Sequence, residues 1–480
     1  MRQLAFILMV LTLVGAVNSV NPGFKMRLTK KGVDYVNDIA QTAIDTQLQK
    51  LDLPDQSGVK GSMSWSLTNI QRTGLSLPKS SMTFDPVKGG LTWALSNFGL
   101  DLSTNWWLSY KKGWLKGSDS GSVDVGVKRF SVSITAGLEA DSQRRPSISI
   151  KSCSSSIGSI QTKFHGSIAF VLNIFKGIVE KKVKQLINDQ VCELLTYLID
   201  QAVQENLREK EVTFEIDDTL VVDFRLLAPV TFAPDYMESQ HKGEVYWREE
   251  QREILPPPAP ISEWTDNSRM LYLWLTEYSA NTLLYATFRR GHFKYHLTHM
   301  DLFPDYSSLL DTTCDPGPCI GSLIPQIGQA YRDSNVEIRI MATTAPQVKI
   351  TSDGLTLNLI GDLDLYADTA DGTAVYLLTL SLSLTLTVNV SVRNQRLIGN
   401  ITNHNFSVSL VKSEVGTIDV DQIQQMLEVT VNQFVITYLN ELGSEGLEIP
   451  LVSEVLFQNS VLTLSNGVVV IGTDVIYHHG

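Results

Sequence analysis

Three histidines in the segment HFKYHLTHM, His292, His296 and His299, have a spacing similar to that of metal ligands on a helix. Two imidazoles four residues apart can share one helical face and hold a zinc ion. The intervening residues argue against a helix, because Phe293 and Tyr295 alternate with polar neighbours. This alternation predicts a strand with one wet face. We therefore interpret the histidines as structural and predict no metal site.

The sequence contains no GxSxG nucleophile elbow, no HExxH motif and no phosphate-binding glycine loop. These motifs place a nucleophile, a zinc ion or a nucleotide phosphate beside the groups that act on it. We predict that the protein is not an enzyme and needs no catalytic cofactor.

The stretch NWWLSYKKGWLKG, residues 105–117, concentrates three tryptophans and three lysines in thirteen residues. Ammonium groups are attracted to lipid phosphates, and indole rings suit the boundary between lipid and water. On a strand, Trp106 and Leu108 would share one face, and Trp107 and Lys111 the other. One indole is therefore expected to pack inward. The alternative interpretation is a core strand followed by a solvated turn.

The chain begins with the features of a secretory signal, in which Arg2 precedes an apolar run over Leu4–Val14 and small residues precede Val20. We predict that residues 1–19 are removed and that the protein is secreted and extracellular. No later segment has about 18 unbroken apolar residues. The nearest candidate starts at Ala374, but it alternates Leu or Val with Ser or Thr, which predicts a strand.

Four cysteines allow three disulfide pairings. The sequence CDPGPC favours a bond between Cys314 and Cys319, which leaves Cys153 to pair with Cys192. Neither pair has the CxxC spacing of a zinc site. Three sequons predict N-linked glycans, and their asparagines are Asn389, Asn400 and Asn405.

The net charge of −12 is distributed unevenly: residues 1–210 carry +8 and residues 211–480 carry −20. We expect no nucleic-acid partner, because the protein is predicted to be exported and has no nucleic-acid-binding motif. The proline-rich segment 254–264 divides the chain into halves of similar pattern. Helices are predicted at 28–54, with Thr29 as N-cap and Pro54 as stop, and at 168–207, 270–288 and 420–442.

Several segments together resemble one family, that of bactericidal/permeability-increasing protein and lipopolysaccharide-binding protein, the lipid-binding serum glycoproteins. They follow one another in the order and at the distances of the family. These segments are VNPGFKMRLTKKGVDYV, the cysteine-framed CSSSIGSI…NDQVCE, KGEVYW, PPPAP, SRMLYLWLTEYSANTLLY, GLTLNL and VVVIGTDVIY. The resemblance supports the pairing of Cys153 with Cys192.

The resemblance implies an α+β fold with the shape of an elongated, two-domain boomerang. Each domain would be a curved antiparallel sheet or barrel wrapped on long helices, with an apolar pocket that holds a phospholipid. A central sheet and the proline-rich linker would join the domains. The predicted boundaries are 20–243 for the N-terminal domain, 244–263 for the linker and central region, and 264–480 for the C-terminal domain.

The resemblance also implies a role for the tryptophan- and lysine-rich stretch. In the lipopolysaccharide-binding members, a basic hairpin at the N-terminal tip carries Trp, two basic residues, a spacer, two bulky apolar residues and Lys. Here Lys111, Lys112, Trp114 and Lys116 match the pattern, and Trp107 precedes it with one extra residue between. These five residues are expected to bind lipopolysaccharide.

Lys60, Lys128 and Arg129 are secondary candidates, expected on hairpins next to the tip. The apolar parity changes between Val127 and Phe130, which predicts a turn or a bulge there.

The function implied is that of a secreted, antibacterial innate-immunity protein that binds the lipid A of Gram-negative bacteria at their outer membrane. One alternative is a phospholipid carrier. Another is a protein that presents lipopolysaccharide to a host receptor through its C-terminal domain. The chain differs from the strongly bactericidal members in its acidic net charge and in the CDPGPC segment.

Overall fold

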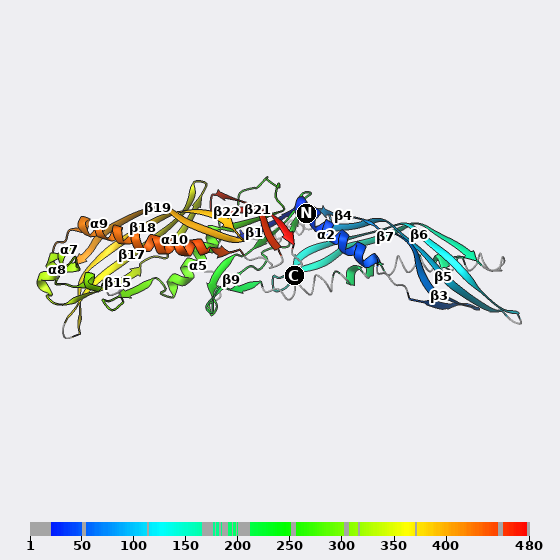
Figure 1. Ribbon diagram of the computed structural model, residues 1–480, viewed down its shortest axis with the longest axis horizontal. Coiled ribbons are helices and arrows are strands. Elements are labelled where there is room, and N and C mark those ends of the chain that lie inside the picture. Colours follow the sequence, from blue (N-terminus) through cyan, green and yellow to red (C-terminus); the bar gives the residue numbers. More distant parts are fainter. Residues whose placement is uncertain are drawn as a thin grey trace, which may run out of the picture.

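The computed structural model is elongated, with one long curved sheet at each end and a third sheet between them (Figure 1). It describes residues 21–49, 54–112, 115–165, 212–250, 256–301, 307–314, 317–369, 372–449 and 455–477, together with single positions between 176 and 199. In this described part of the chain, no helix is long and apolar enough to cross a membrane.

The N-terminal half is an antiparallel sheet with the strand order β2-β3-β5-β6-β7, and β4 also pairs with β5. Its strands are β2 (Gln56–Lys60), β3 (Met63–Ser76), β4 (Lys79–Asp85), β5 (Gly90–Lys112), β6 (Leu115–Ala140) and β7 (Pro146–His165). Helix α2 (Lys30–Gln49) lies against β4, where Val33 packs on Met82 and Phe84. This helix confirms the prediction over 28–54, and Thr29 Oγ1 accepts a long hydrogen bond of 3.5 Å from the amide of Gly32.

Every described position between 176 and 199 is helical, which confirms the predicted helix over 168–207 at those positions. The other positions of that prediction lie outside the described residues. Val179 packs in the cluster of Trp65 and Trp106, while Val191 and Leu195 pack on the cluster of Phe130. The helix therefore covers the apolar face of the sheet. The disulfide Cys153–Cys192 ties it to β7 and confirms the predicted pairing.

The C-terminal half repeats this plan with the strand order β14-β15-β17-β18-β19-β20, and β16 pairs with β17. Its strands are β14 (Lys294–Leu297), β15 (Asn335–Ala342), β16 (Gln347–Thr351), β17 (Gly354–Asp368), β18 (Ala374–Arg393), β19 (Arg396–Ser413) and β20 (Leu447–Glu448). Its helical segments are α5 (Glu277–Arg289), η2 (Ser308–Leu310), α7 (Ile320–Leu323), α8 (Pro325–Ala330), α9 (Val420–Thr430), the π-helical η3 (Val431–Val435) and α10 (Ile436–Glu445). The predicted strand from Ala374 and the predicted helix over 420–442 are both confirmed.

Helices α9 and α10 cover the free edge of β19. Gln424 Oε1 accepts a hydrogen bond from the amide of Val408 at 3.2 Å, and Asn440 Oδ1 accepts one from the amide of Ile401 at 2.7 Å. Such capping satisfies backbone donors that an edge strand would otherwise leave open. At the far end of this half, the predicted disulfide between Cys314 and Cys319 is present just before α7.

The central sheet joins segments from the start, the middle and the end of the chain in the order β10-β11-β1-β13-β22-β21. These strands are β10 (Thr231–Phe232), β11 (Tyr236–His241), β1 (Phe24–Thr29), β13 (Leu271–Thr276), β22 (Val468–Tyr477) and β21 (Val455–Ser465). A small sheet beside it contains β12 (Glu244–Trp247), β9 (Leu220–Asp223) and β8 (Thr213–Glu215).

The prediction of a helix over 270–288 is wrong in its first part, because residues 271–276 form strand β13 and the helix begins at Glu277. Both faces of β13 are covered. Leu271 and Leu273 lie in one apolar cluster, and Tyr272 and Trp274 lie in another. A strand buried on both faces has a continuous apolar run, which periodicity alone does not distinguish from a buried helix.

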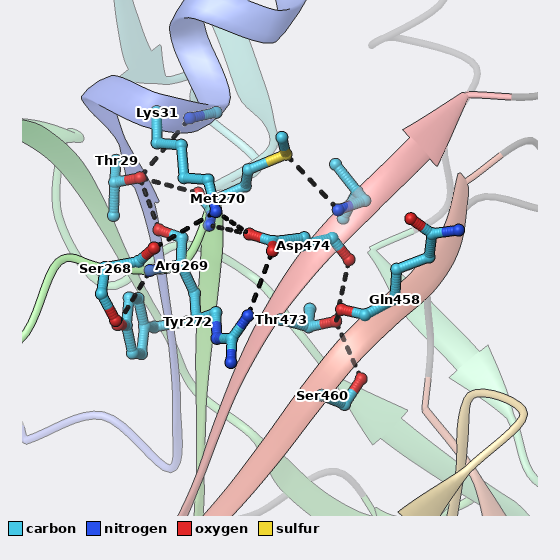
Figure 2. A network of polar contacts seen from close by, with 12 residues as sticks. Thr29, Lys31, Ser268, Arg269, Met270, Tyr272, Gln458, Ser460, Thr473 and Asp474 are labelled. Atoms are coloured by element: carbon cyan, nitrogen blue, oxygen red, sulfur yellow. Dashed lines mark hydrogen bonds and ion pairs between the residues drawn. The ribbon is translucent and has the colours of Figure 1, made fainter.

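Asp474 of β22 is the centre of a polar network that joins three distant segments (Figure 2). Its carboxylate accepts hydrogen bonds from Lys31 Nζ at 2.8 Å, the Met270 amide at 3.2 Å and Arg269 Nη1 at 3.2 Å. Thr29 Oγ1 donates to the Arg269 carbonyl at 2.7 Å. Although burial raises the pKa of Asp474, the hydrogen bond from Lys31 and those from Met270 and Arg269 hold the pKa below its ordinary value.

We expect Asp474→Asn to lower the thermal unfolding midpoint by about 2–4 °C at pH 7, corresponding to a loss of about 2 kcal/mol. A carboxyl with a lowered folded pKa stabilises the protein fully above its unfolded pKa of about 4, and this contribution is lost as pH falls through the folded pKa. The difference between wild type and variant should therefore shrink below about pH 4.

The matched control is Asp38→Asn, which removes an exposed carboxylate from α2, the helix that also carries Lys31. Calorimetry from pH 3 to 8 should show a midpoint close to that of the wild type. Equal midpoints for Asp474→Asn and wild type at pH 7 would show that the network does not stabilise the central sheet.

Candidate lipid-binding tip

Strands β5 and β6 form a long hairpin that extends to the outer end of the N-terminal half (Figure 1). At its end the backbone of Lys111 pairs with Lys116, and that of Lys112 pairs with Leu115. The predicted tip stretch is therefore a hairpin end. Trp114 lies outside the described residues, as does the side chain of Lys112.

The two faces of this hairpin differ in polarity. Trp106 is 3 % exposed and Leu108 is 3 % exposed, whereas Trp107 between them is 44 % exposed. The prediction that one indole packs inward is confirmed. Trp106 meets Phe164 edge to face at 6.1 Å between ring centroids, and its Nε1 donates to the Ser122 carbonyl at 3.1 Å.

Glycines make room for the large aromatic side chains on the inner face. The cross-strand pairs are Gly58 with Trp65, Gly117 with Tyr110, and Gly121 with Trp106. A Cβ at Gly121 would lie 2.1 Å from the His165 carbonyl oxygen and 3.0 Å from Trp106 Nε1. Aromatic residues often pack over glycine on a neighbouring strand, which fixes the register. Sequence reasoning missed these pairs, because only the register brings them together.

Lys60 lies on the neighbouring hairpin of β2 and β3, as predicted. The amide of Lys111 donates to the Ser62 carbonyl at 2.9 Å, so the two hairpin ends are adjacent. Lys60 pairs with Met63, which pairs with Tyr110 of the inner face, while Lys111 belongs to the outer face. Cations therefore flank the tip on both faces.

Lys111 and Lys116 are exposed and lie directly opposite each other, with about 5 Å between their Cα atoms. Among the described residues, no ion pair includes Lys111, Lys116 or Lys60. Like charges directly opposite on a sheet destabilise it slightly. An anion bound between them would remove this repulsion.

The expectation that Lys128 and Arg129 lie on hairpins next to the tip is wrong. They lie within β6, about 40 Å along the strand from Lys116. Lys128 binds the Asp101 carboxylate at 2.6 and 2.7 Å. Arg129 has a φ of 53°, and the register between β5 and β6 shifts there, since Leu100 pairs with Val127 and Phe98 with Phe130, so the parity change is a β-bulge. Nothing places these two residues with the tip lysines.

The histidine segment forms strand β14 at 294–297, which confirms the predicted strand. The prediction of a single wet face is wrong, because Lys294, Tyr295 and His296 are all exposed. His296 Nε2 lies 2.8 Å from Glu337 Oε2. Although burial raises the pKa of Glu337, hydrogen bonds from His296 and Arg339 hold it below the ordinary carboxyl value. Within the described ranges there is no group of three or more His, Cys, Asp or Glu side chains that could hold a metal.

The three sequon asparagines lie on β18 and β19, and each is exposed. Asn389 and Asn400 are direct cross-strand partners, and Asn405 pairs with Thr385 of the same outer face. Their exposure is compatible with glycans, which stay a prediction.

We expect Gly121→Ala to lower the free energy of unfolding by about 1–3 kcal/mol, because the new methyl must displace the His165 backbone or the Trp106 ring. The near-ultraviolet circular dichroism of the tryptophans should change with it. Gly354→Ala is the control, since its Cβ would meet only Thr387 Cγ2, at 3.9 Å. Unchanged stability in Gly121→Ala would mean that the inner face is loosely packed.

Comparisons with known proteins identify the family of this chain. The N-terminal domain model of the LBP / BPI / CETP family matches residues 32–205, and the C-terminal domain model matches residues 214–477. The predicted boundaries at 243 and 263 stay predictions.

The similar proteins include a bactericidal permeability-increasing protein from Sebastes schlegelii, 26 % identical over 98 % of each chain. A lipopolysaccharide-binding protein from Homo sapiens is 24 % identical over 99 % of this chain and 98 % of its own. A phospholipid transfer protein from Mus musculus is 23 % identical over 98 % of this chain and 93 % of its own.

The crystal structure of a lipopolysaccharide binding protein covers 96 % of this chain and 100 % of its own, with a TM-score of 0.58 and 23 % identity. The predicted two-domain α+β fold with curved antiparallel sheets is thereby confirmed. With both domain models matched along most of its length, the chain belongs to the LBP / BPI / CETP family.

Proposed function

We propose that this protein is secreted and binds the lipid A part of bacterial lipopolysaccharide through Lys111, Lys112 and Lys116, and that it acts against Gram-negative bacteria. The observation that carries the proposal is the exposed pair of Lys111 and Lys116 at the end of the β5–β6 hairpin. Each lysine near an anionic lipid surface contributes about 1 kcal/mol of attraction. Relatives named for bactericidal activity and for lipopolysaccharide binding support this proposal.

Apolar side chains beside the cations would contact the acyl chains. Trp114 lies between Lys112 and Lys116 in the sequence, and an indole is stable at the level of lipid headgroups. Phosphates above acyl chains would thus meet cations and an aromatic ring at one hairpin end. The same charges also speed the encounter with an anionic membrane at low salt.

We further propose that each half binds a phospholipid in an apolar pocket, which also makes a phospholipid carrier the second candidate function. The supporting observation is an exposed apolar row on the C-terminal helices, formed by Met426, Val429, Phe434, Tyr438 and Leu442, which are 42–60 % exposed. The π-helical turn η3 spans the five-residue step from Val429 to Phe434, since its hydrogen bonds join residues five apart. Acyl chains packed on this row would remove it from water.

We expect the triple change Lys111→Glu, Lys112→Glu and Lys116→Glu to lower affinity for lipid A vesicles at least 100-fold in low salt, because attraction to phosphate becomes repulsion. The loss should be smaller in high salt, where the Debye length is short. Surface plasmon resonance at several salt concentrations measures both effects.

The control for this triple change is charge reversal at Lys79, Lys181 and Lys184, which are exposed residues of the N-terminal half outside the tip stretch. This control variant has the same net charge as the tip variant and should keep most of the wild-type affinity for lipid A vesicles. If the tip variant binds lipid A as the wild type does, the proposal fails.

For the pocket, we expect the double change Tyr438→Asp and Leu442→Asp to remove one phospholipid from the purified protein, because carboxylates do not pack against acyl chains. Native mass spectrometry should show two lipids on the wild type and one on the variant. Val87→Asp, at a turn position that is 97 % exposed, should leave two. A wild type without lipid would contradict the pocket proposal and leave the tip proposal untouched.

A further inference from the structure

His404 of strand β19 places an imidazole on the largely apolar inner face of the C-terminal sheet. Its neighbours Asn403 and Asn405 are exposed on the outer face, so His404 belongs to the inner one. The residue is half-buried, and its Nε2 atom is buried with no hydrogen-bond partner among the residues whose positions are described. A buried nitrogen in this state is unfavourable, so a ligand that supplies a partner would be bound more tightly.

The side chains next to His404 on the sheet are apolar. The cross-strand row that contains His404 and the adjacent row together include Leu357, Leu386, Leu359, Leu384 and Phe406. Leu386 is 1 % exposed and Phe406 is 7 % exposed, whereas the other three leucines are only half-buried. Hydrocarbon surface on the inner face therefore stays uncovered beside the imidazole.

The helical segment that runs along β19 has its π-helical turn opposite His404 (Figure 1). Hydrogen bonds attach the segment to the strand at two points, where Gln424 meets Val408 and Asn440 meets Ile401. His404 lies about 13 Å along the strand from Val408. The same distance along a helix is about nine residues, which leads from Gln424 into η3. Such turns are frequent at functional sites.

The missing partner of Nε2 has to be an oxygen that is carried within hydrocarbon. An unmodified acyl chain packs on leucine but offers no hydrogen bond to an imidazole. A hydroxyl group donates and accepts, so it pairs with Nε2 in either tautomer of the ring. An ester carbonyl accepts only, so it pairs with one tautomer. A hydroxyl is therefore the group that fits this position best.

We propose that the C-terminal half binds a lipid with a hydroxyl group among its hydrocarbon, and that His404 selects this lipid through a hydrogen bond at Nε2. The inference rests on the proposed function, because it names the class of lipid that the C-terminal pocket prefers. A hydroxylated acyl chain and a sterol both present such a hydroxyl. The other candidate partner of the imidazole is an ordered water, which would give no preference among lipids.

The test incubates the full-length protein with vesicles that contain equal amounts of two phosphatidylcholines, one with a stearoyl chain and one with a hydroxystearoyl chain. Native mass spectrometry gives the ratio of the two bound lipids. The double variant Tyr438→Asp, Leu442→Asp, which should keep only the N-terminal lipid, gives the background ratio. Above this background we expect the wild type to hold the hydroxylated lipid in about tenfold excess, because a hydrogen bond to a buried group is worth about that factor.

We expect His404→Leu to bind the two lipids in nearly equal amounts, because the hydrogen bond is lost. His404→Gln should keep most of the preference, since its amide both donates and accepts. Ser409→Leu is the matched control, because it adds the same apolar side chain at an exposed outer-face position of β19. It should show the wild-type ratio. In a second arm cholesterol replaces the hydroxylated phospholipid, which distinguishes a sterol from a hydroxylated chain.

Enrichment that depends on His404 in either arm supports the inference and identifies the source of the hydroxyl. Equal amounts of both lipids on the wild type in both arms would overturn it and leave the phospholipid pocket standing. A preference that persists in His404→Leu would also overturn it. A wild type that binds no lipid at all would instead contradict the proposed pocket.

Discussion

Strand β1 is the element on which the arrangement of the two halves depends, because it pairs on one side with β11 and on the other with β13. Arg27 of β1 is 3 % exposed, and it binds Glu238 at 2.9–3.0 Å, the Trp264 carbonyl at 2.8 Å and Asn267 Oδ1 at 3.0 Å. A buried guanidinium is stable only when its donors are satisfied. Here the partners come from β11, from the last residue of the proline-rich segment and from Asn267 just after it. The start of the chain, its centre and, through Asp474, its end are therefore held at one joint (Figure 2).

Because the contacts of the central sheet hold the two halves together, the outer end of each half can carry its own surface features. The sheets at the two ends share one plan, with apolar residues facing a covering helix and Ser, Thr and Asn on the outer face. The longest hairpin of the N-terminal sheet reaches the outer end of that half, which places Lys111 and Lys116 far from the acidic C-terminal half (Figure 1). Screening limits exposed charges to about 10 Å at 0.1 M salt, so the negative charge of that half does not cancel the local field at the tip.

The hydrophobic periodicity of the sequence correctly predicted the helices and strands that have one face in solvent. The helix at 30–49, strand β18 and helices α9 and α10 follow from their patterns, as does the opposite orientation of Trp106 and Trp107. It failed where context decides. Strand β13 is buried on both faces and carries no period. The parity change near Arg129 correctly predicted a turn or a bulge, but a bulge and a turn change parity alike, so Lys128 and Arg129 were wrongly expected next to the tip. The glycine–aromatic pairs of the inner face depend on register between distant segments, which a single sequence does not specify.

The pairing of the tip lysines differs from that of some other cations on the N-terminal sheet. There Lys128 binds Asp101, and Lys151 binds Glu139. At the tip two lysines face each other, and the nearest acidic residue in the sequence, Asp119, pairs with Leu108 on the inner face. A sheet selected for stability alone would place an acidic residue opposite Lys111, because opposite charges in direct cross-strand pairs stabilise a sheet. Departures from local stability rules are found mainly at functional sites, so the unfavourable pair supports the proposal that an anion binds at the tip.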